Sequence, residues 1–361
     1  MADQAFSAKH EQLRAEVENH LALYWSNLPP GLPADFSANG QQALGLLREF
    51  TMRPAKRIRG VLAVTGYELF GGQDRHAVLD LSVVMELTQS YLLIIDDVMD
   101  QSLLRRGGPT VQYEYRQQLP SGISRPAGTH AADMLAVTVG LLAQHLATML
   151  LSRITAPAAV MRRLQQVFHG NLIVTSSGQM DDMLSGIGQS SDDLEQTLRM
   201  YGRKSGYYTF VNPLQTGAVL AGAGEADLKA LREFGIHAGT AFQLQDDLLD
   251  MFGQERQTGK STLDDLREGK LTVLMQHALV HADVAQLQVI RRALGNKRVS
   301  HVQHRAVQAV LEATGSRAFT ALRAEQEVQA AQHVLDSQPG WNSATVEFLR
   351  GLLRSMLRRE Q

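Results

Sequence analysis

Two short runs of aspartate carry the most informative chemistry in this 361-residue chain. The first reads DDVMD at positions 96–100, and the second reads DDLLD at 246–250. Both fit the pattern Asp-Asp-x-x-Asp and both interrupt apolar sequence. In a helix, residues four positions apart lie about 40° apart around the axis, so Asp96 and Asp100 would point the same way. The outer aspartates of the second run would do the same, and two facing helices would bring four carboxylates to one space.

Carboxylates crowded on an apolar face repel one another and lose hydration, so the arrangement requires neutralising cations. Oxygen ligands without His or Cys favour Mg²⁺, which keeps several waters and often completes its shell with substrate phosphate oxygens. A single motif of this kind is usually a solvated helix end. Two copies inside apolar runs predict a Mg²⁺-diphosphate site.

A second anionic substrate would need cationic groups of its own, and basic residues flank both motifs. Arg and Lys both suit diphosphate, Arg through paired donors and Lys through a compact charge. Lys56 and Arg59 precede a helical pattern that starts at Val61, and their spacing predicts that they share a face. The further candidates are Arg105, Arg106, Lys204, Lys260 and Lys270.

The elements that position these residues should be helices. Apolar residues recur at helical spacing over 79–95, 134–151, 160–184 and 194–200, while alternating Val, Ile and Thr are scarce. We therefore expect an all-α protein with almost no sheet. The stretch 105–128 is rich in Gly and Pro and is predicted to be the longest irregular segment. No linker divides the chain, so residues 1–361 are expected to form one domain.

The composition excludes several classes of protein. A net charge of −2 provides no basic field for nucleic acid. The absence of cysteine excludes disulfides, thiolate metal sites and a cysteine nucleophile. The N-terminus lacks a signal-peptide pattern, and no apolar run approaches 18 residues, so we expect no transmembrane segment and a cytoplasmic protein.

The motifs resemble those of the trans-isoprenyl diphosphate synthases, the polyprenyl synthetase family, of short-chain farnesyl or geranylgeranyl type. LTQSY at 87–91 leads into the first aspartate motif, and LLRRG follows it at 103–107. FQLQ leads into the second motif, which is followed by GKS at 259–261 and DLREGKLT at 265–272. These motifs keep the order of the family from about Arg53 to Thr272.

This resemblance implies one helical bundle with a deep central cavity, usually as a homodimer. It implies a prenyltransferase that condenses isopentenyl diphosphate with an allylic diphosphate, using three Mg²⁺ ions. The metal site would comprise Asp96, Asp97, Asp100, Asp246, Asp247 and Asp250, with Asp96, Asp100 and Asp246 binding metal and the others assisting. Arg105, Lys204 and Lys260 would hold the allylic diphosphate, with Lys270 nearby. Isopentenyl diphosphate would contact Lys56, Arg59, Gln89 and Arg106, while Lys204, Ser205 and Gln243 would stabilise the reacting carbocation.

Some positions depart from the commonest family pattern. Ala55 replaces a Gly, Gly60 replaces a Pro, Gln89 replaces a His, and Ser205 replaces a Thr. Gln and Ser keep hydrogen-bonding groups, so these two changes are tolerable. The other two affect the backbone beside Lys56 and Arg59.

Product length would depend on residues one turn deeper than Asp96. In the family that these motifs resemble, the residue five positions before that aspartate helps to set the cavity floor, and here it is Tyr91. Helix geometry places Leu92 one turn deeper than Asp96, so these two residues should limit the cavity, which favours a C15 or C20 product. Three alternatives remain open. A class I terpene cyclase or a head-to-head condensing enzyme would share aspartate motifs but not an isopentenyl site, and a non-catalytic regulatory subunit of a prenyl synthase would share the fold.

Overall fold

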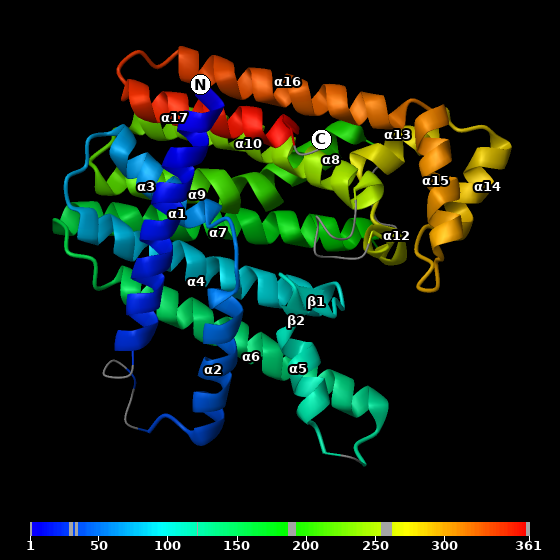
Figure 1. Ribbon diagram of the computed structural model, residues 1–361, viewed down its shortest axis with the longest axis horizontal. Coiled ribbons are helices and arrows are strands. Elements are labelled where there is room, and N and C mark those ends of the chain that lie inside the picture. Colours follow the sequence, from blue (N-terminus) through cyan, green and yellow to red (C-terminus); the bar gives the residue numbers. More distant parts are fainter. Residues whose placement is uncertain are drawn as a thin grey trace.

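A computed structural model describes residues 2–28, 32, 35–120, 122–186, 193–253 and 262–358 of the chain. The all-α prediction is confirmed, since helices form most of the described structure and its two strands are only two residues long each (Figure 1). The helices are α1 (Ala2–Asn27), α2 (Ala38–Met52), α3 (Ile58–Leu69), α4 (Arg75–Met99), α5 (Val111–Gln118), α6 (Arg125–Leu151), α7 (Ala158–Gly186), α8 (Leu194–Tyr201), the π-helix η2 (Gly202–Val211), α9 (Asn212–Leu220), α10 (Glu225–Phe252), α12 (Asp264–Glu268), α13 (Val273–His281), α14 (Val284–Ala293), α15 (His301–Ala313), α16 (Ser316–Asp336) and α17 (Ser343–Leu357).

The long helices pack side by side (Figure 1). Helix α4 packs between α3 and α6, and α10 packs against η2 and α16. Buried side chains on these helices, such as Leu87 and Ile94 of α4 and Phe234 of α10, form the main core. A second buried cluster lies under α12–α15 and includes Leu248 of α10. Because α4 and α10 pack against other helices on several sides, the ends of these two helices, which carry the aspartate motifs, are held in place.

Glycines let α7 and α10 approach the backbone of η2 closely. A Cβ atom on Gly239 of α10 would lie only 2.1 Å from the Cα of Gly206, and one on Gly178 of α7 would lie 2.4 Å from the backbone nitrogen of Lys204. Only a residue without a side chain permits such contact. A π-helix widens the turn, a feature often found at functional sites. Helices α7 and α10 therefore clamp the segment that presents Lys204 and Ser205.

The prediction of a long irregular stretch at 105–128 is wrong. It contains α5, the start of α6 and, with Leu104, a short antiparallel hairpin of β1 (Leu104–Arg105) and β2 (Gly108–Pro109). The two turn residues, Arg106 and Gly107, both have positive φ, 54° and 75°. This is the backbone of the two-residue turns that match strand twist. Gly and Pro thus mark a tight hairpin and helix ends here rather than an extended loop.

Two helices, α4 and α6, are long and apolar enough to cross a membrane by length and composition alone. Two thirds of the apolar window of α4 is buried inside the protein, and less than half of that of α6. Buried core helices have the same composition, so this observation is weak evidence for a membrane span.

Candidate functional site

A cavity of about 510 Å³ lies among α4, α7, η2, α10 and the segment before α13. The outer aspartates of both motifs line it, as the helical spacing predicted. Asp96 lies in the last turn of α4, Asp100 directly follows that helix, and Asp246 and Asp250 lie in α10. Asp182 of α7 and Asp265 of α12 also line the cavity. Two helices from distant parts of the sequence thus bring carboxylates together.

The middle aspartate of the first motif, Asp97, is not among the residues that line this cavity and is fully buried. Arg105 of the hairpin donates from Nε to Asp97 Oδ1 over 2.7 Å, and Gln112 of α5 donates to the Asp97 carbonyl over 2.8 Å. Burial lowers the pKa of Arg105, but the carboxylates of Asp97 and Asp96 outweigh it and raise that pKa. The hairpin is therefore held to α4 by a charged, buried pair.

The middle aspartate of the second motif, Asp247, has neutral partners. The Tyr201 hydroxyl donates to one of its oxygens, and Gln243 Nε2 donates to the other over 2.9 Å. Gln243 in turn accepts from Ser205 Oγ over 2.6 Å, and the Tyr201 hydroxyl accepts from the Val273 backbone over 3.2 Å. Burial, and then the nearby carboxylates of Asp265 and Asp250, hold the pKa of Asp247 well above its usual range. This network joins η2 to α10 and α13.

Two lysines reach the acids of α4 from other elements. Lys204 Nζ lies 2.6 Å from Asp182 and 3.7 Å from Asp96. Lys270 Nζ lies 2.6 Å from Glu268 and 3.4 Å from Asp100. Burial lowers the pKa of each amine, but the carboxylates outweigh it and raise both pKa values. Cations from η2 and from the end of α12 thus neutralise carboxylates of the cavity.

A second cavity, of about 570 Å³, adjoins the first and is lined by several basic residues. Lys56, Arg59, Gln89 and Arg106 line it, together with Arg105. Arg59 donates to Thr209 Oγ1 over 2.7 Å and lies 4.2 Å from the ring centre of Tyr208. The prediction that Lys56 and Arg59 share a helix face is wrong, because α3 begins only at Ile58. Both residues reach this cavity nevertheless, Lys56 from the preceding loop.

Backbone strain accompanies these arginines. Arg57, which caps α3, and Arg106 have φ of 49° and 54°, in the left-handed region that residues with a side chain rarely adopt. Arg57 is held there by hydrogen bonds to the carbonyls of Thr51 and Arg53 and by Glu86, 3.2 Å away. Burial, with the neighbouring guanidinium groups of Arg57, Arg59 and Arg105, lowers the pKa of Arg106 to about 10. An anion bound here would relieve this crowding of cations.

Several lining residues were missed by sequence reasoning. Helix α7 contributes Gln179 and Asp182 and the apolar side chains of Met180 and Met183. The available signal was the pair Asp181-Asp182 near the end of a predicted helix. Tyr91 and Leu92 do line the first cavity. Lys260, which was predicted to bind the allylic diphosphate, lies outside the described residues.

The chain is similar to known proteins over most of its length. A model of the polyprenyl synthetase family matches residues 41–312. A geranylgeranyl diphosphate synthase of Sulfolobus acidocaldarius is 32% identical over 68% of this chain and 69% of its own length. An octaprenyl diphosphate synthase of Escherichia coli is 29% identical over 81% of this chain and 83% of its own length.

A solved structure agrees. The crystal structure of a geranylgeranyl pyrophosphate synthase from Corynebacterium glutamicum, complexed with isoprenyl diphosphate and magnesium, matches this fold with a TM-score of 0.86. The match covers 97% of this chain and 98% of that chain, at 28% identity.

Proposed function

Because the chain belongs to the polyprenyl synthetase family, we propose that it joins isopentenyl diphosphate head-to-tail to an allylic diphosphate, with Mg²⁺ as cofactor. The observation that supports this best is the meeting of two aspartate motifs at one cavity with a basic cavity beside it. Each cavity is within the range, roughly 300–1,000 Å³, of sites for small ligands.

The donor atoms of the first cavity fit magnesium. Asp96, Asp100, Asp246 and Asp250 offer hard carboxylate oxygens, and none of the described residues that line the cavity is a histidine. We assign three Mg²⁺ ions to these outer aspartates, with Asp182 as a further candidate ligand. Bound there, the ions would supply charge that stabilises the departing diphosphate. Asp97 and Asp247 act indirectly in this proposal, since their oxygens already hold Arg105, Tyr201 and Gln243.

Basic side chains bind the two diphosphates separately. Lys204, Arg105 and Lys270, with Lys260, hold the allylic diphosphate beside the aspartates, and Lys204 can exchange its contact with Asp182 for a phosphate oxygen. Lys56, Arg59 and Arg106 hold isopentenyl diphosphate in the basic cavity. Gln89 joins them, because it lines the same cavity and its Nε2 can donate to a phosphate oxygen. The two cavities share Asp246 and Asp250, so the bound substrates would lie side by side.

The chain shapes the reaction in two further ways. Ser205 and Gln243 line the cavity as a fixed hydrogen-bonded pair, and their oxygens would stabilise positive charge on the allylic carbon. Leu92, Ile95 and Phe242 provide partly buried apolar walls that would exclude water from the carbocation. No side chain is needed as nucleophile, because the double bond of isopentenyl diphosphate attacks.

The product we propose is a C15 or C20 prenyl diphosphate. Tyr91 and Leu92 line the cavity one turn deeper than Asp96, where they would stop a growing chain. The relatives differ in this respect, since one is a geranylgeranyl and another an octaprenyl diphosphate synthase. Tyr91→Ala with Leu92→Ala should lengthen the product by at least one five-carbon unit.

We also propose a homodimer. Helices α6 and α7 expose large apolar side chains, which are unusual on the surface of a monomer when they cluster. They include Met134, Leu135 and Leu141 on α6, and Ile173, Met180 and Leu184 on α7. Light scattering on purified enzyme tests this oligomeric state. The cytoplasmic location stays a prediction.

One assay tests the proposed activity. The enzyme receives isopentenyl diphosphate, Mg²⁺ and dimethylallyl, geranyl or farnesyl diphosphate in turn, and products are identified by mass. A linear C15 or C20 diphosphate is expected. Cyclic hydrocarbons formed without isopentenyl diphosphate would instead identify a terpene cyclase, and no product would favour a regulatory subunit. A C40 product would retain the family chemistry and overturn the proposed length.

A further inference from the structure

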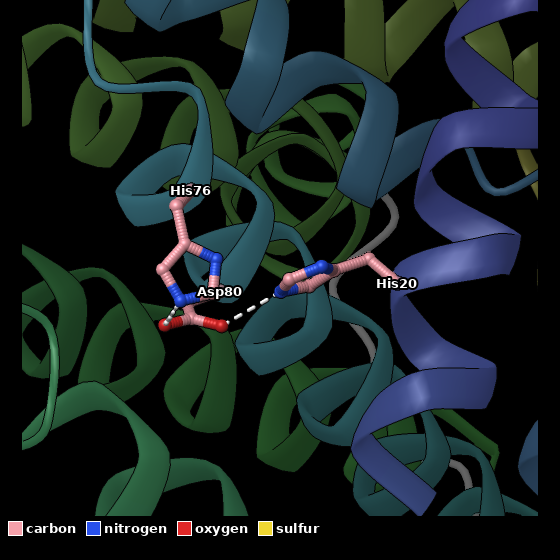
Figure 2. A group of neighbouring side chains, drawn as sticks. All are labelled: His20, His76 and Asp80. Atoms are coloured by element: carbon pink, nitrogen blue, oxygen red, sulfur yellow. Dashed lines mark hydrogen bonds and ion pairs between the residues drawn. The ribbon is translucent and has the colours of Figure 1, made fainter.

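At the end of α4 that lies away from the aspartates, two histidines and one aspartate face one another (Figure 2). His76 and Asp80 lie one turn apart on α4, and His20 reaches them from α1. His20 Nε2 lies 2.7 Å from Asp80 Oδ1, and His76 Nε2 lies 3.9 Å from Asp80 Oδ2. At 1.5 Å per residue, this cluster is roughly 25–30 Å along the helix from Asp96.

The donor atoms are close enough to share one ion. One atom from each side chain lies within 4.8 Å of the other two, and the imidazole rings are 5.3 Å apart in an edge-to-face arrangement. Metal–nitrogen bonds of about 2.0 Å need donors three to four ångströms apart, which small side-chain rotations would provide. Within the residues the structure describes, no other set of three His, Cys, Asp or Glu side chains converges in this way.

Burial prepares two of the three groups and leaves the third accessible. The side chains of His20 and Asp80 are 14% and 20% exposed, while that of His76 is 79% exposed. Val17 and Leu21, buried on either side of His20 in α1, fix the position of its backbone. An ion can therefore reach a largely preformed pair from solvent, and His76 can close over it.

We propose that His20, His76 and Asp80 bind a divalent transition-metal ion of the Zn²⁺ type and tie α1 to α4. Two imidazole nitrogens and one carboxylate oxygen suit Zn²⁺, Ni²⁺ or Cu²⁺, and water would complete four-coordination. Mg²⁺ prefers oxygen ligands alone, so the site would discriminate against the ion of the aspartate cavity.

The charges around the cluster are compatible with a cation. Arg75 directly precedes His76 in the sequence, and it is already paired with Glu16 of α1 and with Glu68, 2.8 Å away. These two carboxylates neutralise its charge. Repulsion between Arg75 and a bound ion is therefore small.

The test is a calorimetric titration of Zn²⁺ into metal-stripped enzyme, with millimolar Mg²⁺ present to occupy the aspartate cavity. The wild type should bind one Zn²⁺ per chain that His76→Ala does not bind tightly. Removing even a hydrogen-bond partner of a metal ligand typically weakens affinity ~10–100-fold, so losing His76 itself should cost at least ~100-fold. His76 is exposed, so the variant should keep its fold, which circular dichroism verifies.

A matched control comes from α13. His277 and His281 are also one turn apart on a helix, with rings 4.0 Å apart, but no third ligand among the described residues completes a trio with them. His281→Ala should leave tight Zn²⁺ binding unchanged, whereas Asp80→Asn should abolish it. Zn²⁺ should also raise the melting temperature of the wild type and of His281→Ala, but not of His76→Ala. Equal Zn²⁺ affinity and equal thermal shifts in wild type and His76→Ala would overturn the proposal.

Discussion

In the first aspartate motif, on α4, the middle aspartate is buried against the guanidinium of Arg105. In the second, on α10, the middle aspartate is buried against the hydroxyl of Tyr201 and the amide of Gln243. The motifs have the same spacing, and their outer aspartates line the same cavity. Asp97 thus belongs to a charged pair, whereas burial and the nearby carboxylates of Asp265 and Asp250 keep the pKa of Asp247 high, although its two neutral donors lower it.

The outer aspartates of the first motif, Asp96 and Asp100, are also paired with cations. Lys204 reaches Asp96 from η2, and Lys270 reaches Asp100 from the end of α12. Cations from the hairpin, from η2 and from the end of α12 therefore contact the motif on α4. Each cation carries a cost of burial that its carboxylate offsets, so removing either partner leaves a charge without compensation. We expect the α4 motif to be sensitive to loss of charge and the middle position of the α10 motif to be sensitive mainly to loss of hydrogen bonds.

The largest effect should separate outer from middle aspartates in activity. Asp246→Asn should lower kcat by at least about 10²–10³-fold, because it removes an oxygen assigned to metal beside the departing diphosphate. Asp247→Asn should stay within about tenfold, since Asn mimics the protonated acid in shape and hydrogen bonding. Single-turnover rates at saturating Mg²⁺ measure both. Equal losses in the two variants would mean that Asp247 also ligates metal.

The next effect concerns stability. Asp97→Asn should lower the free energy of unfolding by roughly 3 kcal/mol, because the buried guanidinium of Arg105 loses its nearer countercharge and keeps Asp96, 3.4 Å away. Urea denaturation in EDTA measures this loss. Asp181→Asn is the matched control, since Asp181 pairs with Arg203 at 2.7 Å on the surface and such pairs contribute about 0–1 kcal/mol. If both variants lost the same small amount, the charged pair at Asp97 would not stabilise the fold.

The contrast between the motifs also marks what sequence can predict. The outer aspartates could be placed from sequence because residues four apart in a helix share a face, which is local geometry. The partners of the middle aspartates could not, since Arg105 acts through a hairpin whose turn needs a positive φ at Arg106, and Tyr201 acts through α8.

Tertiary packing hid other features as well. The π-helix η2 depends on close approach of Gly206 to Gly239, a contact between distant segments. The loop conformation of Lys56 depends on Arg57, whose guanidinium binds carbonyls of the chain before it. Neither arrangement leaves a periodic signal in the sequence. The overall class was nevertheless predictable, because helical periodicity extends over most of the chain.

A smaller effect tests the cations that neutralise the α4 motif. Lys270→Met should lower stability in EDTA by about 2 kcal/mol, the value of a charge-assisted contact, because Asp100 and Glu268 lose their shared ammonium group. Mg²⁺ should then raise the melting temperature of the variant more than that of the wild type. Scans with and without Mg²⁺ measure both quantities. An unchanged Mg²⁺ shift would show that Lys270 and the metal do not compensate the same carboxylates.

The smallest effect should appear at Asp247, and its sign depends on pH. Since the pKa of Asp247 is raised in the folded chain, the folded state keeps a proton that the unfolded state releases above about pH 4. The wild type therefore loses stability as pH rises above that value, whereas Asp247→Asn has no such group to titrate. Near pH 5 the free energy of unfolding of the variant should be lower than that of the wild type by at most about 1 kcal/mol. By about pH 8 this difference should have become smaller or changed sign. Urea unfolding in EDTA at both pH values measures the difference. If the variant instead became less stable relative to the wild type as pH rose, Asp247 would be ionised in the folded protein. The middle aspartates of the two motifs would then both be charged.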